Sequence, residues 1–231
     1  MKVGLFATCI NTIYFTRTVS AARTVLERLG VEIVETEQVC CGQMHINSGY
    51  PKLAKPLVDT VEKNFANCDY IVAPSASCIG SLREHQDRPE LAAKCLDLSE
   101  FLIDILRVTD VGATFNHRVT LHTTCHSLRV AKLGDRPLQL LSAVRGIEVI
   151  ELSAADSCCG FGGTFSVKNS DVSGAMLADK ISNIENTKAE FVVSADNSCL
   201  MHIGGGLQRQ SKKHAGKIEV IHLAEILASR G

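Results

Sequence analysis

The sequence predicts an α/β protein made of two tandem, similar halves, each a parallel sheet covered by helices. Short apolar runs alternate with longer amphipathic stretches, which is typical of parallel strands joined by helices. One cysteine pattern also occurs twice, and its spacing grows from 116 residues between Cys9 and Cys125 to 121 between Cys78 and Cys199. An internal duplication with small loop insertions explains this drift. We therefore expect two Rossmann-like halves, 1–113 and 114–231 of the 231 residues.

The expected elements follow the same order in both halves. The strands are short and rich in Val and Ile, whereas the helices carry apolar residues at helical spacing. In the first half, strands are expected at 3–8, 31–35 and 70–73, and helices at 19–29, 52–65 and 99–106. In the second half, strands are expected at 119–123, 148–152, 191–195 and 218–221, and helices at 137–144, 172–186 and 223–228.

The composition excludes several classes of protein. With 45% hydrophobic residues, 21% charged residues and a net charge of −1, the chain can bury ordinary cores and has no basic surface for nucleic acid. No apolar run is long enough for a transmembrane segment, and the N-terminus turns polar too early for a signal peptide. We expect a cytoplasmic protein, in which ten cysteines indicate metal or redox chemistry more often than disulfides.

Eight of the ten cysteines form two sets, each built around a Cys-Cys-Gly triplet. The first set is Cys9, Cys40, Cys41 and Cys78, and the second set is Cys125, Cys158, Cys159 and Cys199. Each member follows an expected strand, and the carboxyl ends of parallel strands meet at one edge of a sheet. We therefore expect each set to converge on one metal site. Cys68 and Cys95 are interpreted as buried structural thiols.

The adjacent cysteines favour an iron–sulfur cluster over a single ion. Neighbouring side chains diverge in an extended backbone, so both fit poorly around one tetrahedral zinc. Four cysteines are the usual ligands of a [4Fe–4S] cluster, and one or two such clusters are expected per chain. Gly42 and Gly160 would allow a left-handed backbone or a close approach to the cluster. Zinc stays the alternative, although the short Cys-x₂₋₄-Cys pairs of structural zinc sites are absent from the sequence.

The segments 158–168 and 198–205 resemble the cysteine-rich, or CCG, domain family, and within it the lactate utilization members. The family also includes a cysteine-rich component of heterodisulfide reductase and the iron–sulfur subunit of glycolate oxidase. The resemblance implies an iron–sulfur oxidoreductase subunit, not active alone, that takes part in oxidising lactate, a small 2-hydroxy acid, to pyruvate. It implies two partners, a ferredoxin-like iron–sulfur protein that receives electrons and a third lactate utilization subunit. The alternative is a non-catalytic zinc- or thiol-based structural or assembly subunit of the same complex.

The chain departs from the reductase pattern at one position in each half. The reductase ends each motif with a second cysteine three residues on, where this chain has Ser81 and His202. Four thiols per half argue against the reductase's non-cubane cluster and against disulfide reduction. His202 is expected either to ligate iron or donate a proton, or to be an incidental histidine.

Further candidates lie near the second set in the sequence. A 2-hydroxy acid needs a cation for its carboxylate and a base for its hydroxyl proton, which His122, His126, Arg129 and Lys168 would supply if they are not ordinary surface or core side chains. Gly160, Gly162 and Gly163 lack the spacing of a dinucleotide fingerprint and are interpreted as a loop around a cluster. This richer polar inventory makes the second half the better candidate for reactive chemistry.

Overall fold

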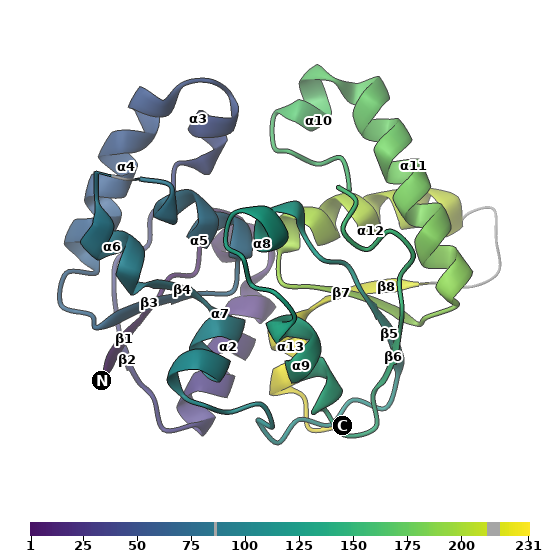
Figure 1. The fold of residues 1–231 in the computed structure, drawn as a ribbon, viewed down its shortest axis with the longest axis horizontal. Coiled ribbons are helices and arrows are strands. Elements are labelled where there is room, and N and C mark those ends of the chain that lie inside the picture. Colours follow the sequence, from purple (N-terminus) through teal and green to yellow (C-terminus); the bar gives the residue numbers. More distant parts are fainter. Residues whose placement is uncertain (86, 212–217) are drawn as a thin grey trace.

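The computed structural model describes residues 1–85, 87–211 and 218–231, and it contains two four-stranded parallel sheets (Figure 1). The strand order is β2-β1-β3-β4 in the first sheet and β6-β5-β7-β8 in the second, so the two sheets share one topology. This confirms an α/β fold with two similar halves, while the division between residues 113 and 114 stays a prediction. The strands are β1 (Lys2–Leu5), β2 (Glu32–Val34), β3 (Tyr70–Ala73), β4 (Cys95–Asp97), β5 (Arg118–Leu121), β6 (Glu148–Ile150), β7 (Phe191–Ser194) and β8 (Glu219–His222).

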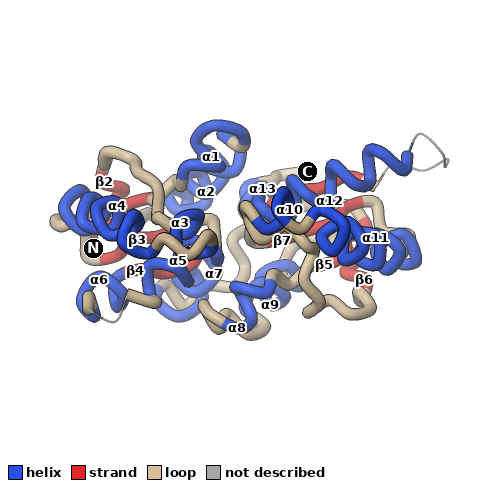
Figure 2. The backbone as a smooth tube through the Cα atoms, turned by 90° about the horizontal axis from the view of Figure 1, so that it is seen from above, coloured by secondary structure: helices blue, strands red, loops and turns tan. Residues whose placement is uncertain are grey.

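Helices surround both sheets, which lie side by side when the molecule is seen from above (Figure 2). Those of the first half are α1 (Cys9–Tyr14), α2 (Thr16–Arg28), α3 (Gln43–Asn47), α4 (Pro51–Asn64), α5 (Ala76–Arg83), α6 (Pro89–Lys94), α7 (Leu98–Glu100) and the π-helix η1 (Phe101–Ile105). Those of the second half are α8 (Cys125–Arg129), α9 (Arg136–Ser142), α10 (Phe165–Lys168), α11 (Ser170–Thr187), α12 (Asn197–Ser211) and α13 (Leu223–Ala228).

Most long elements agree with the sequence-based expectations. The strand at 70–73 and the helix at 223–228 have the predicted bounds, and the other predicted strands and long helices differ by a few residues at their ends. The helix expected at 99–106 is wrong in type. It is the short helix α7 followed by η1, in which the Leu106 N–H donates to the Phe101 carbonyl five residues earlier at 3.0 Å. The three-residue strand β4 was not predicted.

The two halves pack against each other through α2 and α13, which lie next to each other in Figure 1. One buried apolar cluster includes Val25 of α2 and Leu227 of α13, and so joins both halves. Arg28 strengthens this contact, because its guanidinium donates to the carbonyls of Val111, Leu227 and Ala228 at 3.1, 3.1 and 2.7 Å. The halves therefore share one apolar cluster, and each half also has a buried cluster of its own.

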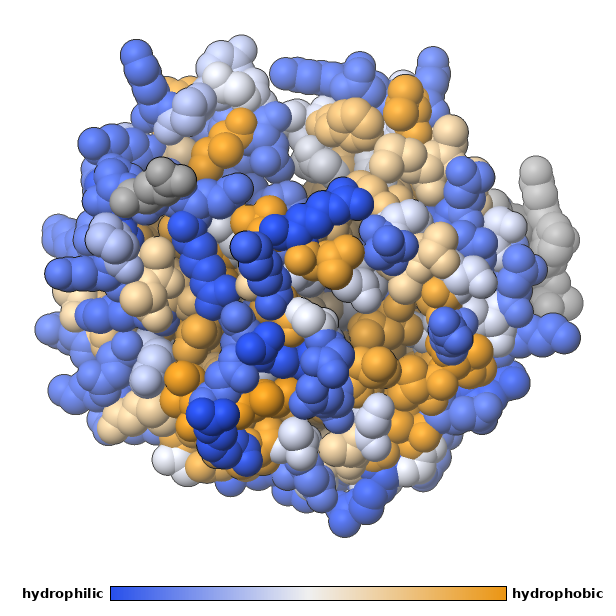
Figure 3. Space-filling model, viewed as in Figure 1, coloured by the Kyte–Doolittle hydropathy of each residue, from blue (hydrophilic) through white to orange (hydrophobic). Residues whose placement is uncertain are grey.

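The surface shown in Figure 3 is mainly hydrophilic along its left edge, which the first half forms, and it carries more apolar residues in its lower part. Throughout the described ranges, none of the helices combines the length and apolar character that crossing a bilayer requires. The large apolar side chains are mostly buried, with Phe6, Phe65 and Phe101 among the largest that are fully enclosed.

Candidate metal centres

Each cysteine set is assembled from three segments at the carboxyl ends of the strands, as the sequence predicts. Cys9 begins α1 after β1, the Cys40–Cys41 pair follows β2, and Cys78 lies in the first turn of α5 after β3. The second set repeats this arrangement, with Cys125 beginning α8 and Cys199 in the first turn of α12. The parallel topology thus brings residues more than thirty positions apart to one end of each sheet.

The four thiols of the first set form a continuous chain of contacts. The Sγ atoms of Cys9 and Cys40 are 3.7 Å apart, and Cys41 is in hydrogen-bonding contact with both Cys40 and Cys78. Cys41 and Cys78 are buried, whereas Cys9 and Cys40 are half-buried. The set therefore has an inner edge in the core and an outer edge near the surface.

The second set has the same chain of contacts. Cys158 is in hydrogen-bonding contact with Cys125 and Cys159, and Cys159 is in contact with Cys199. The sequence analysis expected adjacent thiols to diverge in an extended backbone. In the structure, the two thiols of each pair are in hydrogen-bonding contact with each other and belong to the same set. Adjacency alone therefore does not exclude a single ion.

Hydrogen bonds within each set favour the thiolate form of one cysteine. Hydrogen bonds from Cys41 and then Cys9 lower the pKa of Cys40, and hydrogen bonds from Cys125 and then Cys159 lower the pKa of Cys158. The same contacts raise the pKa of the thiols that donate them. The thiolate is the form that binds metal, so these hydrogen bonds favour Cys40 and Cys158 as ligands.

Gly42 and Gly160 hold this geometry in place, as the sequence analysis expected. Their φ values are 83° and 90°, a left-handed conformation that favours glycine. Their backbone N–H groups donate to the Sγ atoms of Cys40 and Cys158, both at 3.4 Å. A Cβ on Gly42 would lie 2.8 Å from the Cβ of Ala54, and one on Gly160 would lie 2.6 Å from the carbonyl oxygen of Ser173. Each loop is therefore packed tightly against the following long helix.

Gly162 and Gly163 lie in the turn that leads from the second Cys-Cys-Gly triplet into α10. Both have positive φ, 52° and 63°. A Cβ on Gly162 would lie 2.9 Å from the Cβ of Phe165, whereas a Cβ on Gly163 would meet open space. These glycines are needed for the shape of the turn, and their contact with a cofactor stays a prediction.

His122 lies next to the thiols of the second set. The sequence analysis had named it only as a residue close to that set in the sequence. Its side chain is 1% exposed, and within the described part of the chain neither ring nitrogen has a hydrogen-bond partner. A ring nitrogen and the Sγ atoms of Cys159 and Cys199 all lie within 4.8 Å of one another. Burial, and then the nearby Lys180, lower the pKa of His122 to about 3, so the ring is neutral and offers a lone pair to a metal.

The other predicted polar residues are arranged unequally around the second set. His126 is in contact with the set, since its Nδ1 is 3.6 Å from the Sγ of Cys125. His202 is half-buried at the rim, with its Nε2 3.3 Å from the Oγ of Ser173. Arg129 and Lys168 are exposed at the ends of α8 and α10. The geometry therefore places His126 in contact with a thiol and leaves the two cations on the surface.

Sequence reasoning missed Lys180, which is fully buried in α11. Its Nζ donates to the carbonyl of Ala154 at 2.6 Å. Charge interactions with Cys159, Cys158 and Cys199 raise its pKa, against the larger lowering by burial. The structure reveals Lys180 by aligning the two long helices, because α4 carries Val61 at the equivalent position.

The donor sets fit an iron–sulfur cluster by number and chemistry. Four cysteines converge in each half, and backbone N–H groups already donate to sulfur there. The spacing also fits a single ion, since zinc–sulfur bonds of about 2.3 Å place two sulfurs of a tetrahedral site about 3.8 Å apart. The 3.7 Å between Cys9 and Cys40 matches that value. A cluster would require the thiols to move apart.

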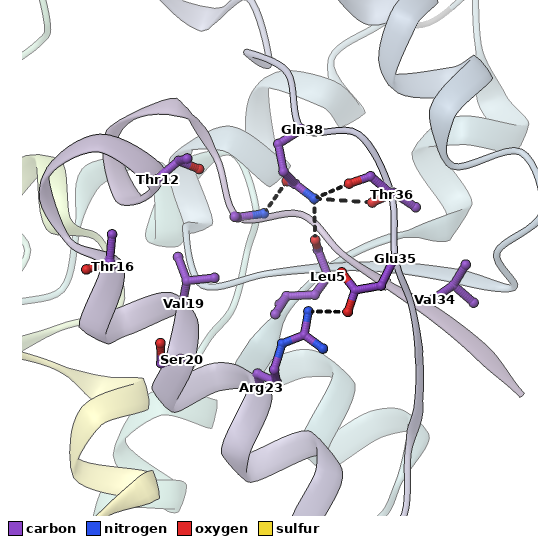
Figure 4. A pocket seen from close by; sticks show the side chains of 11 residues that line it. Leu5, Thr12, Thr16, Val19, Ser20, Arg23, Val34, Glu35, Thr36 and Gln38 are labelled. Carbon is purple, nitrogen blue, oxygen red and sulfur yellow. Dashed lines mark hydrogen bonds and ion pairs between the residues drawn. The ribbon is translucent and has the colours of Figure 1, made fainter.

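A pocket of about 290 Å³ lies beside the first set, between β1, β2 and α2 (Figure 4). Its polar groups are paired with one another. The Gln38 side chain accepts from the Ala7 N–H at 2.8 Å and donates to the Leu5 carbonyl at 3.0 Å, and Arg23 forms an ion pair with Glu35 at 2.8 Å. The pocket therefore offers few free groups to a ligand.

Fold and sites together define a duplicated α/β protein with four converging cysteines in each half, an arrangement compatible with a metal centre. A family model described as a cysteine-rich domain, CCG, matches residues 3–83 and 119–204. The chain belongs to this cysteine-rich domain family.

Several curated relatives named "Lactate utilization protein A" are similar over the whole chain. The relative from Oceanobacillus iheyensis is 42% identical and covers 98% of this chain and 96% of its own length. Those from Geobacillus kaustophilus and Bacillus subtilis are 43% and 42% identical, with 100% of both chains covered. Solved structures are much less similar: a putative Asp/Glu racemase from Yersinia pestis has a TM-score of 0.36 and 12% identity over 98% of this chain and 95% of that one.

Proposed function

We propose that this chain is an iron–sulfur subunit of a system that oxidises lactate to pyruvate, and that it passes electrons to a ferredoxin-like partner. The similarity to relatives named "Lactate utilization protein A" over the full length supports the pathway. The observation that carries the redox role is the convergence of four cysteines in each half, with hydrogen bonds that favour the thiolate form of one of them. When bound, a [4Fe–4S] cluster would supply one-electron transfer.

The ligands would be the four cysteines of each set, with the N–H groups of Gly42 and Gly160 as donors to sulfur. Such N–H···S contacts and the burial of a cluster tune its reduction potential. The inner thiols Cys41 and Cys159 are buried, whereas the outer thiols are half-buried. An electron would therefore leave through the outer edge, where a partner can approach.

Substrate residues are proposed only around the second set. His126 touches Cys125 and His202 lies at the rim, so either would take up or return the hydroxyl proton of a 2-hydroxy acid. Lys168 and Arg129 are exposed, and would pair with its carboxylate only if substrate or a partner approaches that surface. A third lactate utilization subunit is proposed alongside the ferredoxin-like one.

A zinc-binding structural or assembly subunit is the second candidate, and one observation favours it. The 3.7 Å separation of Cys9 and Cys40 is that of two thiolates on a single tetrahedral ion. The group of His122, Cys159 and Cys199 has the nitrogen and sulfur donors that zinc accepts. In this case the redox chemistry would belong to a partner.

Metal analysis separates the two candidates. The chain is purified anaerobically, reconstituted with iron and sulfide, and assayed for iron, sulfide and zinc, followed by electron paramagnetic resonance after reduction. About four iron and four sulfide per occupied half, with a signal that lactate elicits only when the partner proteins are present, supports the proposal. Zinc without sulfide, or a cluster that lactate never reduces in the complete system, refutes it.

A further inference from the structure

The two halves can be compared position by position because their backbones make the same contacts. Gly42 packs on Ala54 of α4, and Gly160 packs on Ser173 of α11. Ala54 and Ser173 are therefore equivalent, and seven residues further along each helix lie Val61 and Lys180, both buried. The two cysteine sets thus have different neighbours on the same side.

The residue that follows the first strand also differs between the halves, apolar in the first and polar in the second. Phe6 and His122 each follow the first strand of a half, and their N–H groups donate to equivalent carbonyls of the neighbouring strand at 2.8 Å. Phe6 packs edge-on against Phe65 at a centroid distance of 5.6 Å. His122 instead directs a ring nitrogen at the thiols. On the side of the long helix and the first strand, the first set has the apolar neighbours Val61 and Phe6, and its nearby imidazole, His45, acts on the outer thiol Cys40. The second set has a lysine and an imidazole at the positions of Val61 and Phe6.

Lys180 lies buried near the second set, whose cysteines interact with its charge. Its side chain is fully buried, and Nζ donates to the carbonyls of Ala154 and Ala155 at 2.6 and 3.4 Å. Burial lowers its pKa, while Cys159, Asp156 and Cys158 favour the charged form. Because Asp156 is exposed and screened by water, the cysteines of the second set are the principal buried groups that favour the charged form of Lys180.

We propose that Lys180 is the countercharge of the second cysteine set and gives the centre there a higher reduction potential than the centre in the first half. This inference rests on the proposed iron–sulfur function. Reduction adds a negative charge to a cluster, and a fixed cation in a low-dielectric site stabilises the more negative state. Val61 offers no such charge in the first half. The resulting potential difference gives electron movement between the two sets a direction.

The test measures the potential of the second centre alone. Cys9→Ser and Cys41→Ser together remove the first set, and the midpoint potential of the remaining centre is followed by electron paramagnetic resonance in an anaerobic redox titration. In this background, Lys180→Met removes the charge and the hydrogen bond. Lys180→Gln removes the charge but keeps an N–H donor for the carbonyl of Ala154. Lys188→Met is the matched control, because it removes the same charge from an exposed position at the end of α11.

Both Lys180 variants are expected to disfavour reduction at least tenfold, which lowers the potential by about 59 mV for a one-electron couple. The Lys188 variant is expected to keep the potential of the background chain. A Lys180→Gln chain with full iron and sulfide but an unchanged potential overturns the inference and leaves the proposed function intact. A parent chain that binds zinc and no sulfide overturns both. Iron and sulfide contents measured on every sample distinguish these results.

Discussion

His122 stands where the first half has Phe6, at the position directly after the first strand of the sheet. The His122 N–H donates to the carbonyl of Val193, and the Phe6 N–H donates to the equivalent carbonyl of Val72, both at 2.8 Å. The backbone is therefore the same, and only the side chain changes the chemistry. One half has an apolar ring behind its thiols, and the other has a neutral imidazole aimed at them.

Replacing His122 with the residue of the first half should weaken metal binding at the second set only. Loss of a ligand or of its supporting partner typically costs about 10–100-fold in metal affinity, so His122→Phe is expected to lose at least this much. The measurement is a competition titration with zinc and a chelator on the reduced, anaerobic chain that lacks the first set. His117→Phe is the control, since His117 is only partly buried and precedes β5, at the end of the sheet opposite the thiols. Equal zinc affinity of the His122 variant and its parent would rule out a ligand role.

The second Cys-Cys-Gly triplet should matter more for turnover than the first. Cys159 is a buried member of a set that also has His122, His126 and Lys180 nearby. We expect Cys159→Ser to abolish lactate-dependent electron transfer with the partners present, and Cys41→Ser to reduce it less. Cys68→Ser is the control, because Cys68 is buried outside both sets. Wild-type activity in the Cys159 variant would contradict this ordering.

Gly42 should not tolerate a side chain, because a Cβ there would clash with Ala54. Gly30 serves as the comparison that separates this clash from the cost of the left-handed backbone. Gly42 and Gly30 both have positive φ, 83° and 75°, but only Gly42 has a close neighbour where a Cβ would be. Gly30→Ala is expected to cost about 1–2 kcal/mol of unfolding free energy from the left-handed backbone alone. Gly42→Ala adds about 1–3 kcal/mol of overpacking against Ala54. Urea unfolding of the metal-free variants checks this, and equal losses would show that the loop relaxes.

The sequence predicted the parts of the fold that depend on local pattern. The strand at 70–73 is a short apolar run and the helix at 223–228 has apolar residues at helical spacing, so both were identifiable without tertiary information. The strand β4 has three residues, too few to establish a period of two. The helix expected at 99–106 is partly a π-helix, and two of its residues, Phe101 and Leu102, lie in the apolar cluster that joins the halves, a tertiary contact that no local pattern reveals.

The grouping of the eight cysteines was predictable because each follows a strand of a parallel sheet. The neighbours of the second set were not. A lysine in an amphipathic helix ordinarily faces water, and nothing local to residue 180 indicates that its side chain is enclosed. Likewise, the closeness of His122 to Cys159 and Cys199 depends on three segments meeting in space. These positions became visible only when the structure aligned the two halves.

His222 should make the folded chain sensitive to mild acid. Its side chain is buried and caps α13, accepting the N–H of Ala224 on Nδ1 at 3.0 Å, and burial lowers its pKa from 6.5 to about 4. Below pH 6.5 the unfolded chain therefore binds a proton that the folded chain does not. The contribution of His222 to the free energy of unfolding therefore falls by about 3 kcal/mol as the pH drops from 6.5 to 4.

His222→Asn should remove this loss, because asparagine caps a helix and does not titrate. Urea unfolding of both chains, metal-free, is measured from pH 7 to pH 4. Burial raises the pKa of Asp97 to about 7, which strengthens folding as pH falls, but this contribution is common to both chains and cancels in the difference. The wild-type chain is expected to lose stability relative to the variant steadily below pH 6.5. A constant difference across that range would mean that His222 accepts a proton in the folded protein as readily as in the unfolded chain.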